Sequence, residues 1–196
     1  MSRLNLAATI INTRWSNVSV LDVGCRGKEL KPLLKDINKY QGIDLMESDE
    51  VIAHDLEQKI PLDDGTYDVV TALDVVEHVD KAHQLMSELL RVSNQVVIVS
   101  LPNMYYWEFR LKYFFGIVIG GKYIFPVDPI KDRHRWLPSY ISSEAFIRGN
   151  AQGAKVEVIP VMVKRRRNKL MNLVEAIGVK VSPNLFAYGG MYILRK

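Results

Sequence analysis

An apolar run over residues 18–23 ends at Gly24 and is interrupted only by Ser19 and Asp22. A short, nearly continuous apolar run bounded by glycine predicts a strand that is covered on both faces. Glycine allows the chain to turn tightly and to lie close to a bound molecule. Because open α/β sheets bind ligands at the carboxyl ends of their strands, we expect the loop at residues 24–27 to contact a ligand.

Similar apolar runs recur along the first half of the chain and predict strands at residues 40–45, 51–54, 67–74 and 95–101. The spacing of apolar residues predicts helices at residues 4–15, 28–37 and 79–91. Residues 60–66 are rich in proline, aspartate and glycine and are expected to form a loop. Strands that alternate with helices in this way predict an α/β fold with a doubly wound, mostly parallel sheet.

The second half of the chain has a different composition. Residues 104–119 are densely aromatic and apolar, and a helix there would place five side chains on one face: Met104, Trp107, Leu111, Phe114 and Phe115. Ser142 or Ser143 is expected to cap a further helix, in which Phe146 and Ile147 point inward. A strand at 155–163, a helix at 170–177 and a strand at 185–194 complete the predicted sheet.

The composition fits one domain over residues 1–196. Of the 196 residues, 48% are hydrophobic and 24% are charged, which is enough apolar surface to build a full core. Cys25 is the single cysteine, so an intramolecular disulfide and a multi-cysteine zinc site are excluded. With no signal-peptide pattern at residues 1–12, a cytoplasmic location is expected. The net charge of +4 permits anionic partners without requiring them.

Four motifs follow one another at characteristic spacing: Leu21-Asp22-Val23-Gly24-Cys25, Ile43-Asp44-Leu45, Asp55-Leu56 followed by residues 60–70, and Leu73-Asp74-Val75-Val76-Glu77-His78-Val79. Together they resemble class I S-adenosylmethionine-dependent methyltransferases over about residues 18–102. The resemblance implies a three-layer, Rossmann-like sheet of about seven strands, mostly parallel with the last antiparallel, and helices on both faces. It also sets residues 103–138 apart as an aromatic-rich insertion or lid.

The same resemblance implies S-adenosyl-L-methionine as the cofactor and gives each acid a task. Asp44 would bind the ribose, with Leu45 beside it, while the Asp55 carboxylate and the Leu56 amide would bind the adenine. The methionine end would be held by Asp22, Gly24, Cys25, Gly27, Leu73 and Asp74. Carboxylates suit this end because the cofactor carries an ammonium group and a sulfonium.

The glycine loop departs from the family pattern, because Arg26 and Lys28 stand where glycine is expected. Either Gly27 takes over with a shifted turn, or the loop is wider and holds the cofactor less tightly. A nicotinamide-dependent dehydrogenase is a weaker interpretation, since the full Gly-x-Gly-x-x-Gly pattern is absent.

Two histidines are candidates for the general base, His78 and His134, because imidazole changes protonation near neutral pH. In this position such methyltransferases build the acceptor site, which makes Arg133, Arg135 and Trp136 the candidates for substrate binding. No metal is assigned. An alternative is a divalent cation held by Asp74, Glu77 and His78 with a further ligand from His83 or His134. In the simpler interpretation, the Glu-His step only shapes the turn into the next helix.

The predicted activity is methyl transfer to an oxygen, nitrogen or carbon nucleophile of a small-molecule acceptor. One alternative is a non-catalytic relative that keeps the fold and binds the cofactor. Another is an enzyme acting on RNA through the basic run at residues 164–169, although a short basic run is more often a solvated surface. A third is an enzyme acting on a lipid. Residues 104–119 would suit peripheral contact with a membrane, a lid over the substrate or contact with a second subunit in a homodimer.

Overall fold

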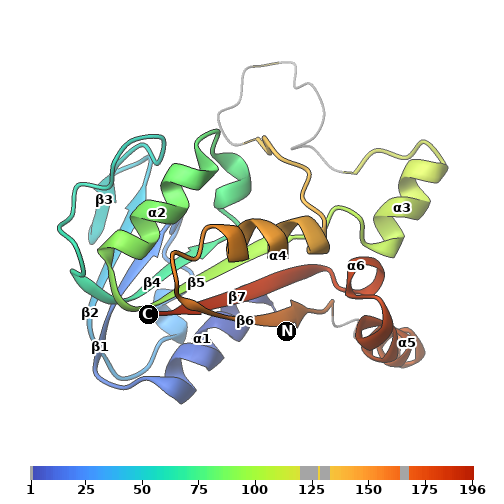
Figure 1. The fold of residues 1–196 in the computed structure, drawn as a ribbon, viewed down its shortest axis with the longest axis horizontal. Helices are drawn as coiled ribbons and strands as arrows, with labels where there is room; N and C mark the ends of the chain where they lie inside the picture. The colour runs from blue at the N-terminus through green and yellow to red at the C-terminus, as the bar shows by residue number, and fades with distance from the viewer. Residues whose placement is uncertain (1, 120–127, 129–132, 164–167) are drawn as a thin grey trace.

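The computed structural model of the chain describes residues 2–119, 128, 133–163 and 168–196 (Figure 1). Within these residues, one seven-stranded sheet has the strand order β3-β2-β1-β4-β5-β7-β6. The strands are β1 Val18–Val23, β2 Ile37–Asp44, β3 Val51–Ala53, β4 Tyr67–Leu73, β5 Ser93–Pro102, β6 Lys155–Val161 and β7 Gly189–Arg195. The first five strands are parallel, whereas β7 runs antiparallel to both β5 and β6. This confirms the predicted fold class, including the antiparallel last strand.

Helices cover both faces of the sheet (Figure 1). They are α1 Arg3–Arg14, α2 Ala82–Val92, α3 Trp107–Phe114, α4 Tyr140–Gly149, α5 Lys169–Val181 and α6 Pro183–Phe186, with 3-10 turns η1 Lys31–Leu33 and η2 Val76–His78. None of the helices in the described part of the chain is long and apolar enough to cross a membrane.

In the described residues, two apolar clusters form the core, one on each face of the sheet. Side chains alternate along a strand, so Val69 lies in the cluster with α1 whereas Val70 lies in the cluster with α2 and α4. Val96 and Val97 divide between the clusters in the same way. Both faces of the central strands are therefore buried, which explains why their sequences are almost continuously apolar.

The helix predicted at residues 28–37 is wrong, because this segment holds only the short η1 turn and the start of β2. Lys28 and Asp36 have φ angles of +59° and +48°, in the left-handed region that stops a helix. Asn12 of α1 binds the segment directly, since its side chain donates to the Leu33 carbonyl and accepts from the Lys35 amide. Leu33 and Leu34 are spaced as in a helix because they pack in the cluster with α1, although the segment is not helical.

Most element boundaries differ from the prediction by a few residues, and two of these differences have a clear local cause. Helix α4 begins at Tyr140 and is capped by Ser139, whose Oγ accepts from the Ser142 amide at 3.0 Å while Ser142 Oγ accepts from the Ser139 amide at 2.8 Å. Ser142 is therefore the third residue of the helix, where it completes the capping box, and it is not the N-cap. The predicted strand at 185–194 starts only at Gly189, because the chain before it forms α6.

The aromatic segment at residues 104–119 forms a shorter helix than predicted. Helix α3 covers Trp107–Phe114 only, and Met104 is buried in the turn before it. Leu111, Phe114 and Phe115 are exposed, so the predicted helix face does not pack on the sheet. The remainder of the predicted insertion includes residues 120–127 and 129–132, which lie outside the described residues, as do residues 164–167 of the basic run.

An ion pair ties the loop at residues 60–66 to α2. Glu88 lies buried and accepts from Arg91 Nη2 at 2.6 Å and from the Ile60 amide at 2.9 Å. Arg91 also donates to the Leu62 carbonyl at 2.7 Å and to Asp64 at 2.8 Å. The Arg91 guanidinium holds the pKa of Glu88 below its ordinary value of 4.5.

We expect Glu88→Gln to lower the free energy of unfolding at pH 7 by about 1–3 kcal/mol, the usual loss for a buried charge-assisted hydrogen bond. Since the pKa of Glu88 is lower in the folded protein, its stabilising effect is present above pH 4.5 and is lost as the pH falls through the folded-state pKa. The midpoint temperatures of thermal unfolding of the wild-type chain and of Glu88→Gln should therefore converge as the pH is lowered from 7. Glu144→Gln, which removes the exposed Glu144–Arg148 pair, is the control and should cost less than about 0.5 kcal/mol. Equal losses in the two variants would contradict this assignment.

Candidate functional site

The loop after β1 is held against the end of β2. The amides of Gly24 and Cys25 both donate to the Ile43 carbonyl, at 2.8 and 3.2 Å. A Cβ on Gly24 would lie 2.4 Å from a methyl group of Val75, and the φ angle of Gly24 is +71°. Only glycine fits this position without strain. The loop therefore runs along the carboxyl edge of the sheet, where the structure brings the ends of β1, β2 and β4 together.

Arg26 and Lys28 keep the backbone conformation that glycine would adopt. Their φ angles are +47° and +59°, and the Lys28 amide closes the turn on the Cys25 carbonyl at 2.8 Å. Left-handed conformation costs an ordinary residue about 1–2 kcal/mol. Lys28 Nζ offsets part of this by donating to the Asp49 carbonyl at 2.7 Å. The left-handed conformations lie at Arg26 and Lys28 themselves. The alternative in which the turn shifts so that Gly27 replaces the missing glycines is therefore wrong.

Asp44 stands at the end of β2 and binds the loop directly. One carboxylate oxygen accepts from the Arg26 amide at 2.8 Å, and the other accepts from the Leu45 amide at 2.7 Å. A carboxylate has about four lone-pair positions, so Asp44 can accept further hydrogen bonds from a diol. Leu45 is 57% exposed and offers an apolar surface beside it. The predicted contact of Asp44 and Leu45 with the ribose stays a prediction.

Asp22 lies inside the sheet, between β1, β2 and β4. Its two oxygens accept from Tyr40 Oη at 2.9 Å and from Thr71 Oγ1 at 2.7 Å. Burial raises the pKa of Asp22 to about 6. The Asp22 carboxylate thus braces the three strands that carry the loop, and its predicted contact with the methionine end stays a prediction.

Cys25 contributes packing at the same edge. Its Sγ would lie 2.5 Å from a Cβ on Gly42, so the thiol fills the space above a glycine of β2. Burial, with the nearby carboxylates of Asp22 and Asp44, raises the pKa of the Cys25 thiol to about 12. The thiol therefore stays protonated and is unsuited to nucleophilic chemistry.

Asp74 follows β4 and is bound by a residue that the sequence analysis missed. One of its oxygens accepts from Ser100 Oγ at 2.6 Å, and the other forms an ion pair with Arg3 at the start of α1. Burial lowers the pKa of the Arg3 guanidinium, whereas the nearby Glu77 raises it. No motif surrounds Arg3, so only the packing of α1 against the sheet places this cation at the end predicted to hold the methionine group.

The residues predicted to bind adenine lie beyond β3. Asp55 is exposed and accepts from the Glu57 amide at 3.0 Å, while Leu56 packs against the core. The His54 amide donates to the Asp44 carbonyl at 2.7 Å, which fixes the end of β3 beside the end of β2. The predicted adenine and ribose residues are therefore neighbours along one edge.

Residues 133–138 form a strap that crosses η2. The amides of Arg135 and Trp136 both donate to the Glu77 carbonyl, and Trp136 Nε1 donates to the Val79 carbonyl at 2.8 Å. The Arg135 guanidinium pairs with Asp80 at 2.5 Å. The structure thus brings the predicted substrate residues onto the predicted catalytic segment. It also gives Arg135 a structural contact, and its role toward a substrate stays a prediction.

Glu77 and His78 of η2 and His134 of the strap lie close together. Their potential ligand atoms all lie within 4.8 Å of one another, and the centroids of the two imidazole rings are 4.3 Å apart. Glu77 is buried. One carboxylate and two imidazoles are a donor set that could hold a divalent cation. This set differs from the alternative drawn from the sequence, because Asp74 pairs with Arg3 and His83 packs edge-on against Phe146.

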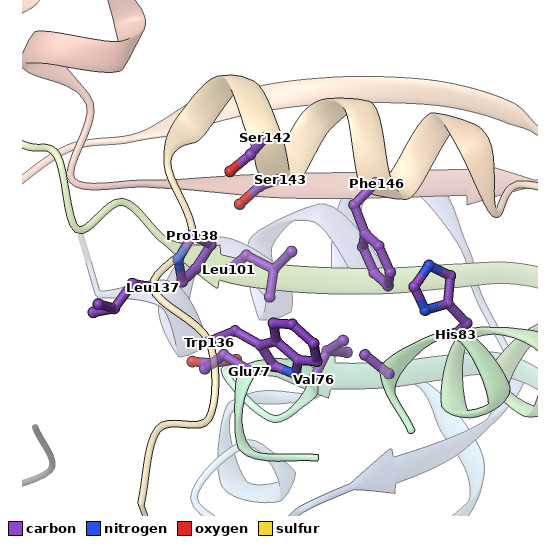
Figure 2. Close-up of a pocket in the computed structure, with 11 residues that line it drawn as sticks. Val76, Glu77, His83, Leu101, Trp136, Leu137, Pro138, Ser142, Ser143 and Phe146 are labelled. Atoms are coloured by element: carbon purple, nitrogen blue, oxygen red, sulfur yellow. The ribbon is translucent and has the colours of Figure 1, made fainter. Parts of the chain in front are cut away.

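A cavity of about 230 Å³ lies between η2, which carries Glu77, and α4 (Figure 2). Figure 2 shows Trp136, Leu137 and Pro138 of the strap closing one side, while Ser142, Ser143 and Phe146 descend from α4. The walls are mostly apolar and aromatic, and the Glu77 side chain stands at their polar edge. Its full lining is Val76, Glu77, Ala82, His83, Leu101, Trp136, Leu137, Pro138, Ser142, Ser143 and Phe146. Such a cavity suits an apolar or aromatic ligand that carries a polar group.

The fold is shared with methyltransferases of known structure. The chain aligns over 99% of its length, with a TM-score of 0.66 and 15% identity, to the small RNA methyltransferase HEN1, of which it covers 25%. It aligns over 97%, with a TM-score of 0.58 and 18% identity, to an S-adenosylmethionine-dependent methyltransferase from Archaeoglobus fulgidus, covering 91% of it. Magnesium protoporphyrin IX methyltransferase from Synechocystis, with S-adenosylhomocysteine bound, gives a TM-score of 0.60, 18% identity and coverages of 98% and 81%.

Sequence comparison identifies the family. A curated relative, the mitochondrial ubiquinone biosynthesis O-methyltransferase of Saccharomyces cerevisiae, is 27% identical over 150 residues. The match covers 66% of this chain, which spans about half the length of that relative, 46% of it. The family model described as methionine biosynthesis protein MetW matches residues 6–127, which is more than half of the 196 residues. The chain therefore belongs to the MetW family, and its fold is that of the class I S-adenosylmethionine-dependent methyltransferases.

Proposed function

We propose that the chain is an S-adenosylmethionine-dependent methyltransferase whose acceptor is a small molecule with an apolar or aromatic body. One observation carries the proposal: Val75 packs against Gly24 of the loop predicted to bind the cofactor, and Glu77, two residues further on, belongs to the Glu77–His78–His134 cluster and lines an apolar cavity. A donor site and an acceptor site then lie on either side of residues that can take up a proton.

The residues at the sheet edge fit the cofactor in order along its length. Asp55 and Leu56 would bind the adenine, and Asp44, with Leu45, would bind the ribose. The methionine end would meet the backbone of the glycine loop, Leu73, Asp74 and the brace formed by Asp22. The Arg3 guanidinium, close to Asp74, supplies a cation for the methionine carboxylate. When bound, the cofactor supplies an activated methyl group on a sulfonium.

The protein's own groups would orient the acceptor and remove its proton. His78 Nδ1 lies 3.1 Å from the Arg133 carbonyl oxygen, which can only accept, so Nδ1 carries a hydrogen and Nε2 is the basic nitrogen. His134 lies against the same ring, and Glu77 Oε1 is 3.9 Å from His78 Nε2. During methyl transfer, this cluster would take up the proton that the acceptor atom loses. Holding the two reactants in line would supply most of the rate increase.

A non-catalytic relative is the second candidate, and the cost of Arg26 and Lys28 in the left-handed region is the observation that favours it. Cofactor binding without turnover against a broad panel of small acceptors would support that candidate over the enzyme. The RNA-directed alternative depends on the basic run at residues 164–169, most of which lies outside the described residues.

We expect titration calorimetry to show that S-adenosylhomocysteine binds the wild-type chain, and that Asp44→Ala weakens binding about 10- to 100-fold. The reason is the net loss of about one hydrogen bond to a charged acceptor, worth about 1.5–3 kcal/mol. Asp63→Ala, which removes an exposed acid of the loop at residues 60–66, is the matched control and should leave the affinity unchanged. Absence of heat at high micromolar ligand would sink the proposal, as would equal affinities for the two variants.

The role of Arg3 can be tested with two ligands that differ only at the methionine end. We expect Arg3→Met to weaken S-adenosylhomocysteine about tenfold, the value of one charge-assisted contact. The same variant should bind 5′-methylthioadenosine, which lacks the amino-acid group, as well as the wild-type chain does. Equal losses for both ligands would show instead that Arg3 only supports the fold of the site.

A further inference from the structure

Helix α5 turns its apolar face away from the protein. Leu170, Leu173, Ile177 and Val181 are 73%, 57%, 59% and 83% exposed, and Val174 between them is exposed as well. Their spacing of three or four residues places them on one side of the helix. A helix of a globular domain ordinarily buries such a stripe against its core. Helix α5 instead exposes its apolar stripe, which indicates that another surface binds there.

A buried carboxylate fixes this orientation. Glu175 is the single acid of α5 and lies fully buried, where it accepts from Trp107 Nε1 at 2.8 Å and from the Tyr106 hydroxyl. On the same helix, Gly178 packs so closely on Phe186 of α6 that a Cβ would lie 2.6 Å from the ring. Because turning the helix would expose Glu175 and break these contacts, the apolar stripe has to face outward.

A second set of exposed apolar side chains lies at the same end of the molecule. Glu175 ties α5 to the start of α3, and Figure 1 shows α3, α5 and α6 together beyond the sheet. At the end of α3, Phe114 and Phe115 are 82% and 68% exposed, and Ile117 and Val118 are exposed after it. We call the outward faces of α3 and α5, with residues 115–118, the apical surface.

The charges around the apical surface are mainly positive. Lys169 and Lys180 lie exposed near the two ends of α5, and Arg110 and Lys112 lie exposed on α3. Glu108 is the one acid of these two helices besides the buried Glu175. In the sequence, four further cations stand directly before Asn168, at residues 164–167. Apolar side chains bordered by lysine and arginine are typical of helices that lie in the interface of an anionic membrane.

We infer that the apical surface binds an anionic lipid surface, with α5 lying in the plane of the interface. The charge pattern decides between a lipid surface and a second copy of this chain. Two copies that met through α5 would bring Lys169 and Lys180 of both chains into one apolar interface, where like charges repel. Anionic headgroups would instead neutralise these lysines while the stripe enters the acyl boundary. This inference extends to α5 the membrane contact expected from the sequence for residues 104–119, and it does not depend on methyl transfer.

Co-sedimentation with vesicles tests the inference. The wild-type chain is expected to bind vesicles of phosphatidylcholine mixed with phosphatidylglycerol, to bind phosphatidylcholine alone at least about tenfold more weakly, and to dissociate as salt is raised. Leu173→Glu and Ile177→Glu should each weaken binding to the mixed vesicles about tenfold or more. Met46→Glu changes a side chain that is 80% exposed at the opposite edge of the sheet and is the matched control. It should bind the vesicles as the wild type does.

Three results would overturn the inference: no binding of the wild-type chain to mixed vesicles, equal losses for Leu173→Glu and Met46→Glu, or a wild-type dimer in sedimentation equilibrium that Leu173→Glu converts to a monomer. The last would assign the apical surface to a second copy. Unchanged thermal unfolding and unchanged affinity for S-adenosylhomocysteine in Leu173→Glu would show that the variant is folded. The affinity for S-adenosylhomocysteine also distinguishes failure of this inference from failure of the proposed methyl transfer.

Discussion

The hydrogen bond from the Arg26 amide to the Asp44 carboxylate joins the two strand ends on which the site depends. Arg26 makes this bond from a left-handed conformation, with a φ angle of +47°. The Gly24 and Cys25 amides reinforce the junction at the Ile43 carbonyl. A loop of this shape is a feature of nucleotide-binding sheets, and here it is kept with long, charged side chains in place of two glycines.

The two sides of this junction differ in polarity. Asp44 and Asp74 present carboxylates to the edge, and Arg3 enters from α1 to pair with Asp74. Beyond η2, Trp136, Leu137 and Pro138 of the strap form an aromatic and aliphatic wall beside Glu77. A polar cofactor and an apolar acceptor would therefore meet where these two environments join. The outward apolar stripe of α5 belongs to the surface that we propose binds lipid, and it does not line the cavity beside Glu77.

The sequence predicts the sheet well because strands buried on both faces leave nearly continuous apolar runs, as in β1, β4 and β5. It predicts the helix at 28–37 wrongly because Leu33 and Leu34 pack on α1 from an irregular turn, and packing alone reproduces helical spacing. The contact of the strap with Glu77 joins residues almost sixty positions apart, and no local pattern encodes it. Arg3 and the inward Glu175 likewise acquire their roles only through tertiary packing.

We propose that one continuous site runs from the carboxyl edge of the sheet to the cavity beside Glu77. A crystal structure with S-adenosylhomocysteine bound would test this proposal. We expect the ribose hydroxyls to lie within hydrogen-bond distance of Asp44, the ligand's carboxylate to contact Arg3, and its sulfur to face the Glu77–His78–His134 cluster and the cavity. A ligand bound elsewhere, or one whose sulfur is separated from the cavity by the strap, would contradict it.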